Sequence, residues 1–214
     1  MKEELLRRMT DGGIVAIMRR TESSLAIETV DALYRGGVFV VEVTLNTDGA
    51  LDMISALAGH FGDQVLVGAG TVMDVASAQA ALDAGAKFIV APHTDVAVIR
   101  FANEADRPVI PGAFTPTEIV HAWRAGADLV KVFPVGSVGP RYLRDVLAPL
   151  NDIPLLPTGG VTLDNAAEFI RSGARGLGLG SDLVNPKLVT ARSFDAIADR
   201  ARAFVSEVTR GRTS

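Results

Sequence analysis

One lysine stands inside an apolar stretch, Leu129-Val130-Lys131-Val132-Phe133-Pro134. A strand buried on both faces reads as a nearly continuous hydrophobic run, so a lone ammonium in such a run is costly unless it is paired or neutralised. Burial favours the neutral amine, which is the form that attacks a carbonyl to make a Schiff base. The alternative is an edge-strand lysine whose ammonium reaches water. Lys131 is therefore a candidate nucleophile.

A carboxylate occupies a similar position in Val40-Val41-Glu42-Val43-Thr44. Side chains alternate along a strand, so Glu42 lies on the face opposite Val41 and Val43. If that face is the interior of the protein, Glu42 points toward the same axis as Lys131. The pair could be a structural ion pair, or Glu42 could transfer protons while Lys131 makes and breaks an imine.

Strand and helix patterns alternate from end to end and predict the elements that position these two residues. An amphipathic helix over residues 1–9 precedes eight strand–helix units. Parallel pairing of eight such units predicts a single-domain α/β protein over residues 1–214, a (β/α)8 TIM barrel with an extra N-terminal helix. A doubly wound open sheet is the competing architecture. The expected strands begin near residues 13, 38, 65, 88, 109, 129, 155 and 176.

An internal repeat favours the barrel. Alternate helices end on a small glycine motif, at Gly36, Gly85, Gly126 and Gly173, and these glycines are 49, 41 and 47 residues apart. Each is predicted to stop a helix in the left-handed conformation. Four pairs of units give the eight strands, whereas an open sheet would not be expected to show this near-regular spacing of glycines.

Polar residues where the strands end are the next candidates, because barrel enzymes place their chemistry at the carboxyl ends of the strands. The glycine-containing turns Thr158-Gly159-Gly160 and Gly178-Leu179-Gly180-Ser181 follow the last two strands and predict a phosphate site built from backbone N–H groups. The alternative is that these glycines only permit tight turns. The full set is Arg19, Glu42, Thr44, Thr71, Pro92, His93, Lys131, Phe133, Thr158, Gly159, Gly160, Gly180 and Ser181.

Composition excludes several other classes of function. The 214 residues carry a net charge of −4, which gives no basic footprint for nucleic acid. The chain has no cysteine, which rules out disulfides and thiolate chemistry, and its three histidines show no ligand spacing, so we expect no metal. We found no signal peptide and no run of membrane-spanning length, and we expect a cytoplasmic protein.

Seven short motifs together resemble one family, the class I (Schiff-base) 2-keto-3-deoxy-6-phosphogluconate (KDPG) aldolases, grouped with 4-hydroxy-2-oxoglutarate (KHG) aldolase. The resemblance covers about residues 14–183. The motifs are Val41-Glu42-Val43-Thr44-Leu45, Val67-Gly68-Ala69-Gly70-Thr71-Val72, Val90-Ala91-Pro92-His93, Pro111-Gly112, Lys131-Val132-Phe133-Pro134, Pro157-Thr158-Gly159-Gly160 and Gly178-Leu179-Gly180-Ser181.

The resemblance implies a role for each site residue. Lys131 resembles the imine-forming lysine and Glu42 the general acid/base that acts through a water molecule. Arg19, Asn46 and Thr71 resemble the groups near the substrate carboxylate, with Pro92 and Phe133 as walls of the pyruvyl pocket. Thr158 resembles the residue that reads hydroxyl stereochemistry, and Gly159, Gly160, Gly180 and Ser181 resemble the phosphate site. The family also implies a carbon–carbon lyase without metal or organic cofactor, acting on a small 2-keto acid phosphate, and a homotrimer.

Two residues divide the substrate prediction. Asn46 stands where some members carry an arginine that grips the carboxylate, and asparagine brings no charge to replace it. Asn46 is typical of 6-phosphogalactonate aldolases, whereas Thr158 is typical of the gluconate type. We expect cleavage of 2-keto-3-deoxy-6-phosphogluconate to pyruvate and glyceraldehyde 3-phosphate. Cleavage of the galactonate epimer or of 4-hydroxy-2-oxoglutarate, and an imine-free phosphate-binding isomerase or epimerase, stay open as alternatives.

Overall fold

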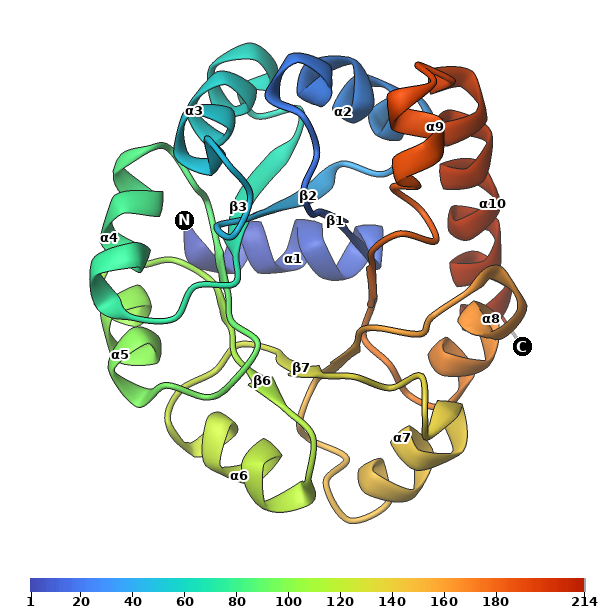
Figure 1. Cartoon of the computed structure of the whole chain (residues 1–214). Coiled ribbons are helices and arrows are strands. Elements are labelled where there is room, and N and C mark those ends of the chain that lie inside the picture. The colour runs from blue at the N-terminus through green and yellow to red at the C-terminus, as the bar shows by residue number, and fades with distance from the viewer. Residues whose placement is uncertain (214) are drawn as a thin grey trace.

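Strands and helices alternate along the chain in the computed structural model, which describes residues 1–213 (Figure 1). The strands are β1 (Ile14–Met18), β2 (Val40–Thr44), β3 (Leu66–Gly70), β4 (Ile89–Val90), β5 (Val109–Ile110), β6 (Gly112–Ala113), β7 (Val130–Val132), β8 (Leu155–Pro157) and β9 (Leu177–Leu179). The helices are α1 (Lys2–Gly12), α2 (Ala26–Arg35), α3 (Ala50–Phe61), α4 (Val75–Asp83), α5 (Val96–Glu104), α6 (Pro116–Arg124), α7 (Gly139–Leu147), α8 (Leu163–Arg171), α9 (Pro186–Thr190) and α10 (Phe194–Arg212).

The strands form two parallel sheets that surround a common axis, with the helices α2 to α10 outside them (Figure 1). One sheet has the order β5-β4-β3-β2-β1-β9 and the other the order β6-β7-β8. An α/β fold with parallel strands is therefore confirmed. The expected continuous eight-stranded ladder is not confirmed. Pro111 separates β5 from β6, and a single bridge, Thr158 to Gly178, joins β8 to β9. Proline has no N–H to donate, so the ladder is interrupted there.

Side chains from the strands fill two separate cores. The outer core lies between the strands and the surrounding helices, and it holds Val41, Val43, Val130 and Val132. The inner core lies inside the ring of strands and includes Leu129. Helix α1 contributes Leu5 and Met9 to the inner core, and Figure 1 shows this helix lying across the ring. One end of the ring is thus closed by apolar packing. The other inner-core residues are Val15, Val40, Leu66, Phe88, Val90, Ile110 and Leu156.

Three of the four glycines predicted to end helices in the left-handed conformation do so, and at the first motif the next glycine takes that role. Gly85, Gly126 and Gly173 have φ values of 103°, 103° and 101°, as expected for left-handed helix ends. At the first motif the left-handed residue is Gly37, with φ 91°, and Gly36 stays right-handed. A Cβ on Gly36 would lie 2.3 Å from the Cβ of Ala201, so Gly36 permits the close packing of α2 on α10.

Two short helices near turns were not predicted from the sequence. Ser23 and Ser24 open the 3-10 helix η1 (Ser23–Leu25) and give no side-chain cap to it or to α2. The short helix α9, after β9, carries no hydrophobic pattern long enough to predict from sequence. It begins at Pro186, and Asn185 caps it by accepting a hydrogen bond from the N–H of Lys187 at 2.9 Å.

A capping box fixes the turn between β6 and α6, which lies next to the strand of Lys131. The Glu118 carboxylate accepts hydrogen bonds from the N–H groups of Thr115 and Phe114, both at 2.8 Å, and the Thr115 hydroxyl accepts one from the N–H of Glu118. The N–H groups of Thr115 and Phe114 lower the pKa of Glu118 below its ordinary value of 4.5.

Replacing Glu118 with alanine should lower the free energy of unfolding by about 1 kcal/mol at neutral pH, because both N–H groups lose their acceptor. The folded-state pKa is lowered, so this stabilisation is present above pH 4.5 and is lost as pH falls through the lower folded value. Urea unfolding of wild type and Glu118→Ala across this range would show the two stabilities converging in acid. Glu168→Ala, an exposed change on α8, is the control.

Candidate active site

Lys131 and Glu42 meet inside the ring of strands, beyond the inner core. The two side chains are 4% and 2% exposed, and Lys131 Nζ lies 4.0 Å from Glu42 Oε1. Lys131 shares its face of β7 with the inner-core Leu129, and Glu42 shares its face of β2 with the inner-core Val40. Alternation therefore placed Glu42 correctly on the face opposite Val41 and Val43, and that face is the interior that it shares with Lys131. At 4.0 Å the charges attract, but the atoms are too far apart for a hydrogen bond.

Glu42 lies over a glycine of the neighbouring strand. Gly70 ends β3, and a Cβ on it would lie 1.8 Å from Glu42 Oε1 and 2.3 Å from the carboxyl carbon. Any larger residue would displace the carboxylate. Glu42 Oε1 is also buried without a hydrogen-bond partner among residues 1–213, so it can accept a hydrogen bond from a bound molecule.

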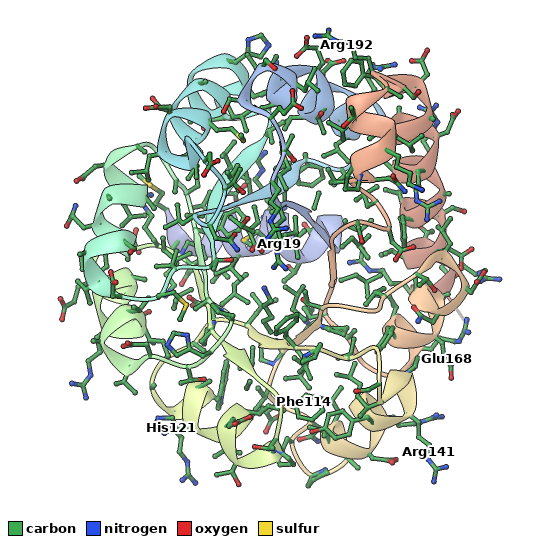
Figure 2. All side chains as sticks on the ribbon, in the orientation of Figure 1. Arg19, Phe114, His121, Arg141, Glu168 and Arg192 are labelled. Carbon is green, nitrogen blue, oxygen red and sulfur yellow. The ribbon has the colours of Figure 1, made fainter. Side chains whose placement is uncertain are left out.

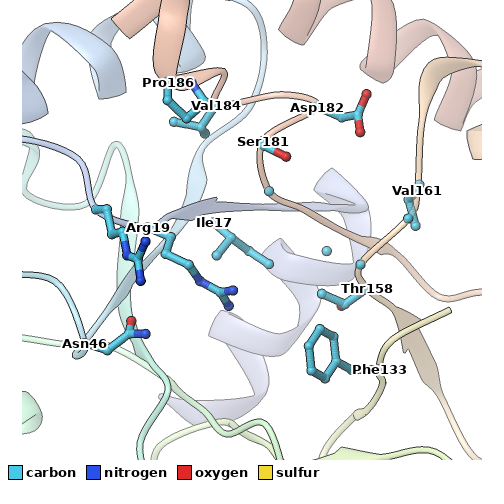
Figure 3. A pocket seen from close by; sticks show the side chains of 15 residues that line it. Ile17, Arg19, Asn46, Phe133, Thr158, Val161, Ser181, Asp182, Val184 and Pro186 are labelled. Carbon is cyan, nitrogen blue, oxygen red and sulfur yellow. The ribbon is translucent and has the colours of Figure 1, made fainter. Parts of the chain in front are cut away.

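A cavity of about 590 Å³ opens at the carboxyl ends of the strands (Figure 3). Arg19, Asn46 and Ile17 lie on one side of it and Phe133 and Thr158 on the other, with Ser181 and Asp182 at a third edge. Figure 2 shows Arg19 near the centre of the ring, whereas Arg141, Glu168 and Arg192 lie at the periphery. The structure thus brings together eight of the predicted site residues: Arg19, Asn46, Phe133, Thr158, Gly159, Gly160, Gly180 and Ser181.

Two packed turns form the glycine side of the cavity. Gly159 and Gly160 have φ values of 76° and 101°, and a Cβ on Gly160 would lie 2.2 Å from the Cα of Gly136 in the turn after β7. The turn after β9 is held from outside, because Arg200 of α10 donates to the backbone carbonyl of Asp182 and pairs with its carboxylate at 3.1 Å. Both turns are therefore fixed by their surroundings.

Thr158 is buried, and it also lines the cavity. Its side chain is packed against β9, where a Cβ on Gly178 would lie 2.2 Å from Thr158 Oγ1. The hydroxyl donates to the carbonyl of Leu156 at 3.3 Å. Since a hydroxyl has one proton, Oγ1 keeps lone pairs that can accept a hydrogen bond.

The remaining predicted residues, Lys131 and Glu42 among them, are not part of the cavity lining. Lys131 Nζ lies 5.4 Å from the centre of the ring of Phe133, which does line the cavity. Phe133 also lines a second hollow, together with Pro92 and His93. Thr71 follows Gly70 with φ 57°, a left-handed conformation that is unfavourable for a residue with a branched Cβ. Neither Thr71 nor Pro92 lines the main cavity.

Sequence reasoning missed several residues of the site. Arg20, Asp182, Val184 and Pro186 also line the cavity. Arg20 is adjacent to a residue that was predicted, and a second cation at a strand end was a signal that could have been read. The sequence did not predict that the carboxylate of Glu42 occupies the space above Gly70. Glycines do alternate with a larger residue at Gly68 and Gly70 of β3.

Within residues 1–213, histidine, aspartate and glutamate side chains form no group of three or more that could hold a metal ion. Across the same residues, no helix combines the length and the apolar character needed to span a bilayer.

Comparisons with known proteins identify the family. The family model for KDPG and KHG aldolase matches residues 5–200. The chain belongs to this family. It is an aldolase, and hence a carbon–carbon lyase. The chain is 37% identical over 193 residues to the 2-dehydro-3-deoxy-6-phosphogalactonate aldolase of Escherichia coli, a match that covers 90% of this chain and 92% of that one.

Solved structures of KDPG and KHG aldolases share the fold. A native KDPGal structure superposes with a TM-score of 0.88 at 35% identity, covering 94% of this aldolase and 96% of that chain. A KDPG aldolase of Legionella pneumophila, with pyruvate captured as a covalent carbinolamine, superposes with a TM-score of 0.84 at 26% identity. That match covers 90% of this chain and 93% of the other.

Gly70→Ala should lower kcat for aldol cleavage by about a hundredfold, the range expected when a general acid/base is displaced. Shortening the displaced residue should restore room, so the double variant Gly70→Ala/Glu42→Asp should be faster than Gly70→Ala alone. Steady-state rates of the two single variants and the double variant form a cycle that isolates the coupling.

Gly59→Ala is the matched control, because a Cβ at Gly59 in α3 meets nothing within 4 Å. Its activity should equal that of wild type. Wild-type kcat in folded Gly70→Ala would show that the space over this glycine does not position Glu42.

Proposed function

We propose that this aldolase cleaves a 2-keto-3-deoxy-6-phosphoaldonate to pyruvate and glyceraldehyde 3-phosphate through a Schiff base on Lys131. One observation carries the proposal: the buried amine of Lys131 lies 4.0 Å from a carboxylate oxygen that has no other partner among the described residues. An amine and a proton acceptor at this separation can serve a carbonyl carbon and a hydroxyl two carbons away, the hydroxyl through a water molecule.

The reaction begins when Lys131 passes a proton to Glu42 and the resulting neutral amine attacks the C2 ketone. Glu42 gives this proton to the carbinolamine hydroxyl, which leaves as water, and the protonated imine that results acts as an electron sink. Glu42 accepts the C4 hydroxyl proton through a water molecule, the C3–C4 bond breaks, and its electron pair moves into an enamine on the pyruvyl fragment. Protonation of that enamine at C3 and hydrolysis of the imine release pyruvate and regenerate both side chains.

The two ends of the cavity suit the two anionic ends of such a substrate. Arg19 offers a guanidinium for the carboxylate, and Asn46 can add hydrogen bonds but no charge. The turns with Gly159, Gly160 and Ser181 offer backbone N–H groups for the phosphate, in the place where barrel enzymes bind it. No step requires a metal or an organic cofactor.

Two residues point to different epimers. The galactonate epimer is the first candidate, since Asn46 favours it and the Escherichia coli relative bears that name. The gluconate epimer is the second candidate, favoured by Thr158, whose hydroxyl proton goes to the carbonyl of Leu156 and whose oxygen can accept a hydrogen bond from the substrate.

We also infer that the two sheets form one closed (β/α)8 barrel. The segment of β5 and β6 acts as one strand with a break at Pro111, since β5 pairs with β4 and β6 pairs with β7. The bridge between Thr158 and Gly178 supports closure on the other side. A homotrimer stays a prediction from the family resemblance.

Borohydride reduction in the presence of pyruvate should trap a stable secondary amine on Lys131, detectable by peptide mass spectrometry. Lys131→Ala should show neither adduct nor cleavage, and Lys131→Arg is the control that keeps the charge without the nucleophile. Glu42→Gln should still form the adduct while cleavage slows by about a hundredfold or more. A folded Lys131→Ala with a few per cent of wild-type cleavage would exclude the imine.

Thr158→Val should shift the ratio of kcat/KM toward the galactonate epimer, by about tenfold for the loss of one hydrogen bond to a substrate hydroxyl. Thr158→Ser keeps the hydroxyl and should keep the wild-type ratio. Cleavage rates for both epimers with the three proteins provide the measurement. An unchanged ratio in Thr158→Val would remove Thr158 from the specificity site.

A further inference from the structure

Two arginines in succession follow β1, and both line the main cavity. Arg20 is exposed there, and no carboxylate in residues 1–213 forms an ion pair with either Arg19 or Arg20. By contrast Asp182, the acidic residue of the cavity lining, is paired with Arg200 at 3.1 Å. The cavity therefore carries two positive charges that its own side chains do not balance.

The backbone of Arg20 is held in an unfavourable conformation. Its φ is 55°, in the left-handed region that disfavours residues with a Cβ. A hydrogen bond from its N–H to Thr47 Oγ1, at 2.9 Å, maintains this geometry. Thr47 Oγ1 in turn lies 3.1 Å from the hydroxyl of Thr44, which donates to the carbonyl of Met18. This buried threonine network ties the turn after β1 to the turn after β2.

The same network decides which side of the cavity Arg20 serves. The sheet order places β1 between β2 and β9, and the Thr47 bond ties Arg20 to the β2 side. Asn46 directly precedes Thr47, whereas the turn with Ser181 follows β9. Arg20 is thus anchored beside the neutral Asn46, away from the glycine turns after β8 and β9.

We propose that Arg20 is a second cationic binding residue for the substrate, which pairs with the carboxylate of the 2-keto acid on the side where Asn46 supplies no charge. This assignment rests on the proposed Schiff-base function. It also accounts for the left-handed conformation, because strain in a short turn is kept where it aims a functional side chain.

Pyruvate has the carboxylate and lacks the phosphate, so it is the direct probe. In borohydride trapping at varied pyruvate concentration, Arg20→Gln should raise the half-saturating concentration by about tenfold and leave the maximal adduct unchanged. Inhibition of cleavage by inorganic phosphate should stay at the wild-type level. Moving the charge to the other residue, in Arg20→Gln/Asn46→Arg, should restore pyruvate affinity.

A second variant separates binding from folding. Glycine accepts a φ of 55° without strain, so Arg20→Gly should unfold at a temperature equal to or above that of wild type while it still binds pyruvate weakly. Arg20→Lys keeps a charge and should retain part of the affinity. Arg100→Gln, an exposed change on α5, is the control and should bind as wild type does.

The outcomes that would contradict the assignment of Arg20 differ from the one that would contradict the Schiff-base function. An unchanged half-saturating concentration in both Arg20→Gln and Arg20→Gly would overturn the assignment, as would an effect confined to phosphate inhibition. Wild-type protein that forms no pyruvate adduct at all would instead refute the Schiff-base function on which the assignment rests.

Discussion

The burial of two opposite charges, Lys131 and Glu42, is the constraint on which the rest of the site depends. A charged group removed from water is costly, and the attraction between two such groups offsets that cost only when their geometry is close. Here Lys131 Nζ and Glu42 Oε1 are 4.0 Å apart, near enough for their charges to attract but too far for a direct hydrogen bond. The pair is therefore held by the strands on which it stands, and both groups stay available for chemistry.

The apolar inner core and the polar cavity lie at opposite ends of the ring of strands, with Lys131 and Glu42 between them. The inner core and α1 fill one end of the ring with apolar side chains, including Leu5, Met9 and Phe88, and exclude water there. The other end is lined by arginine, glycine turns and hydroxyls. Room for Glu42 between these regions comes from the missing side chain of Gly70. A larger residue there would improve apolar burial but would move the carboxylate away from Lys131.

Periodicity was enough to predict features that depend on one strand or helix at a time. Alternation placed Glu42 on the face of β2 opposite Val41 and Val43. The alternating strand and helix patterns predicted the order of the elements, and the helix-ending glycines predicted their repeat. Features that depend on contacts between distant segments could not be predicted this way. The left-handed glycine is Gly37 because Gly36 packs on Ala201 of α10, and the space over Gly70 is defined by a side chain from β2. Arg20 could have been noticed as a second cation at a strand end, but its tie to the turn after β2 depends on the hydroxyl of Thr47.

The cavity is asymmetric in a way that orients a substrate with two anionic ends. Guanidinium groups stand at the ends of β1, whereas the turns after β8 and β9 offer backbone N–H groups. A carboxylate pairs well with the planar fork of an arginine, and a phosphate is well bound by converging N–H groups near a helix N-terminus. We infer that the substrate of the proposed function binds with its carboxylate at the arginines and its phosphate at the glycine turns. The same asymmetry disfavours the reversed orientation, in which the phosphate would face the arginines and the carboxylate would face the glycine turns.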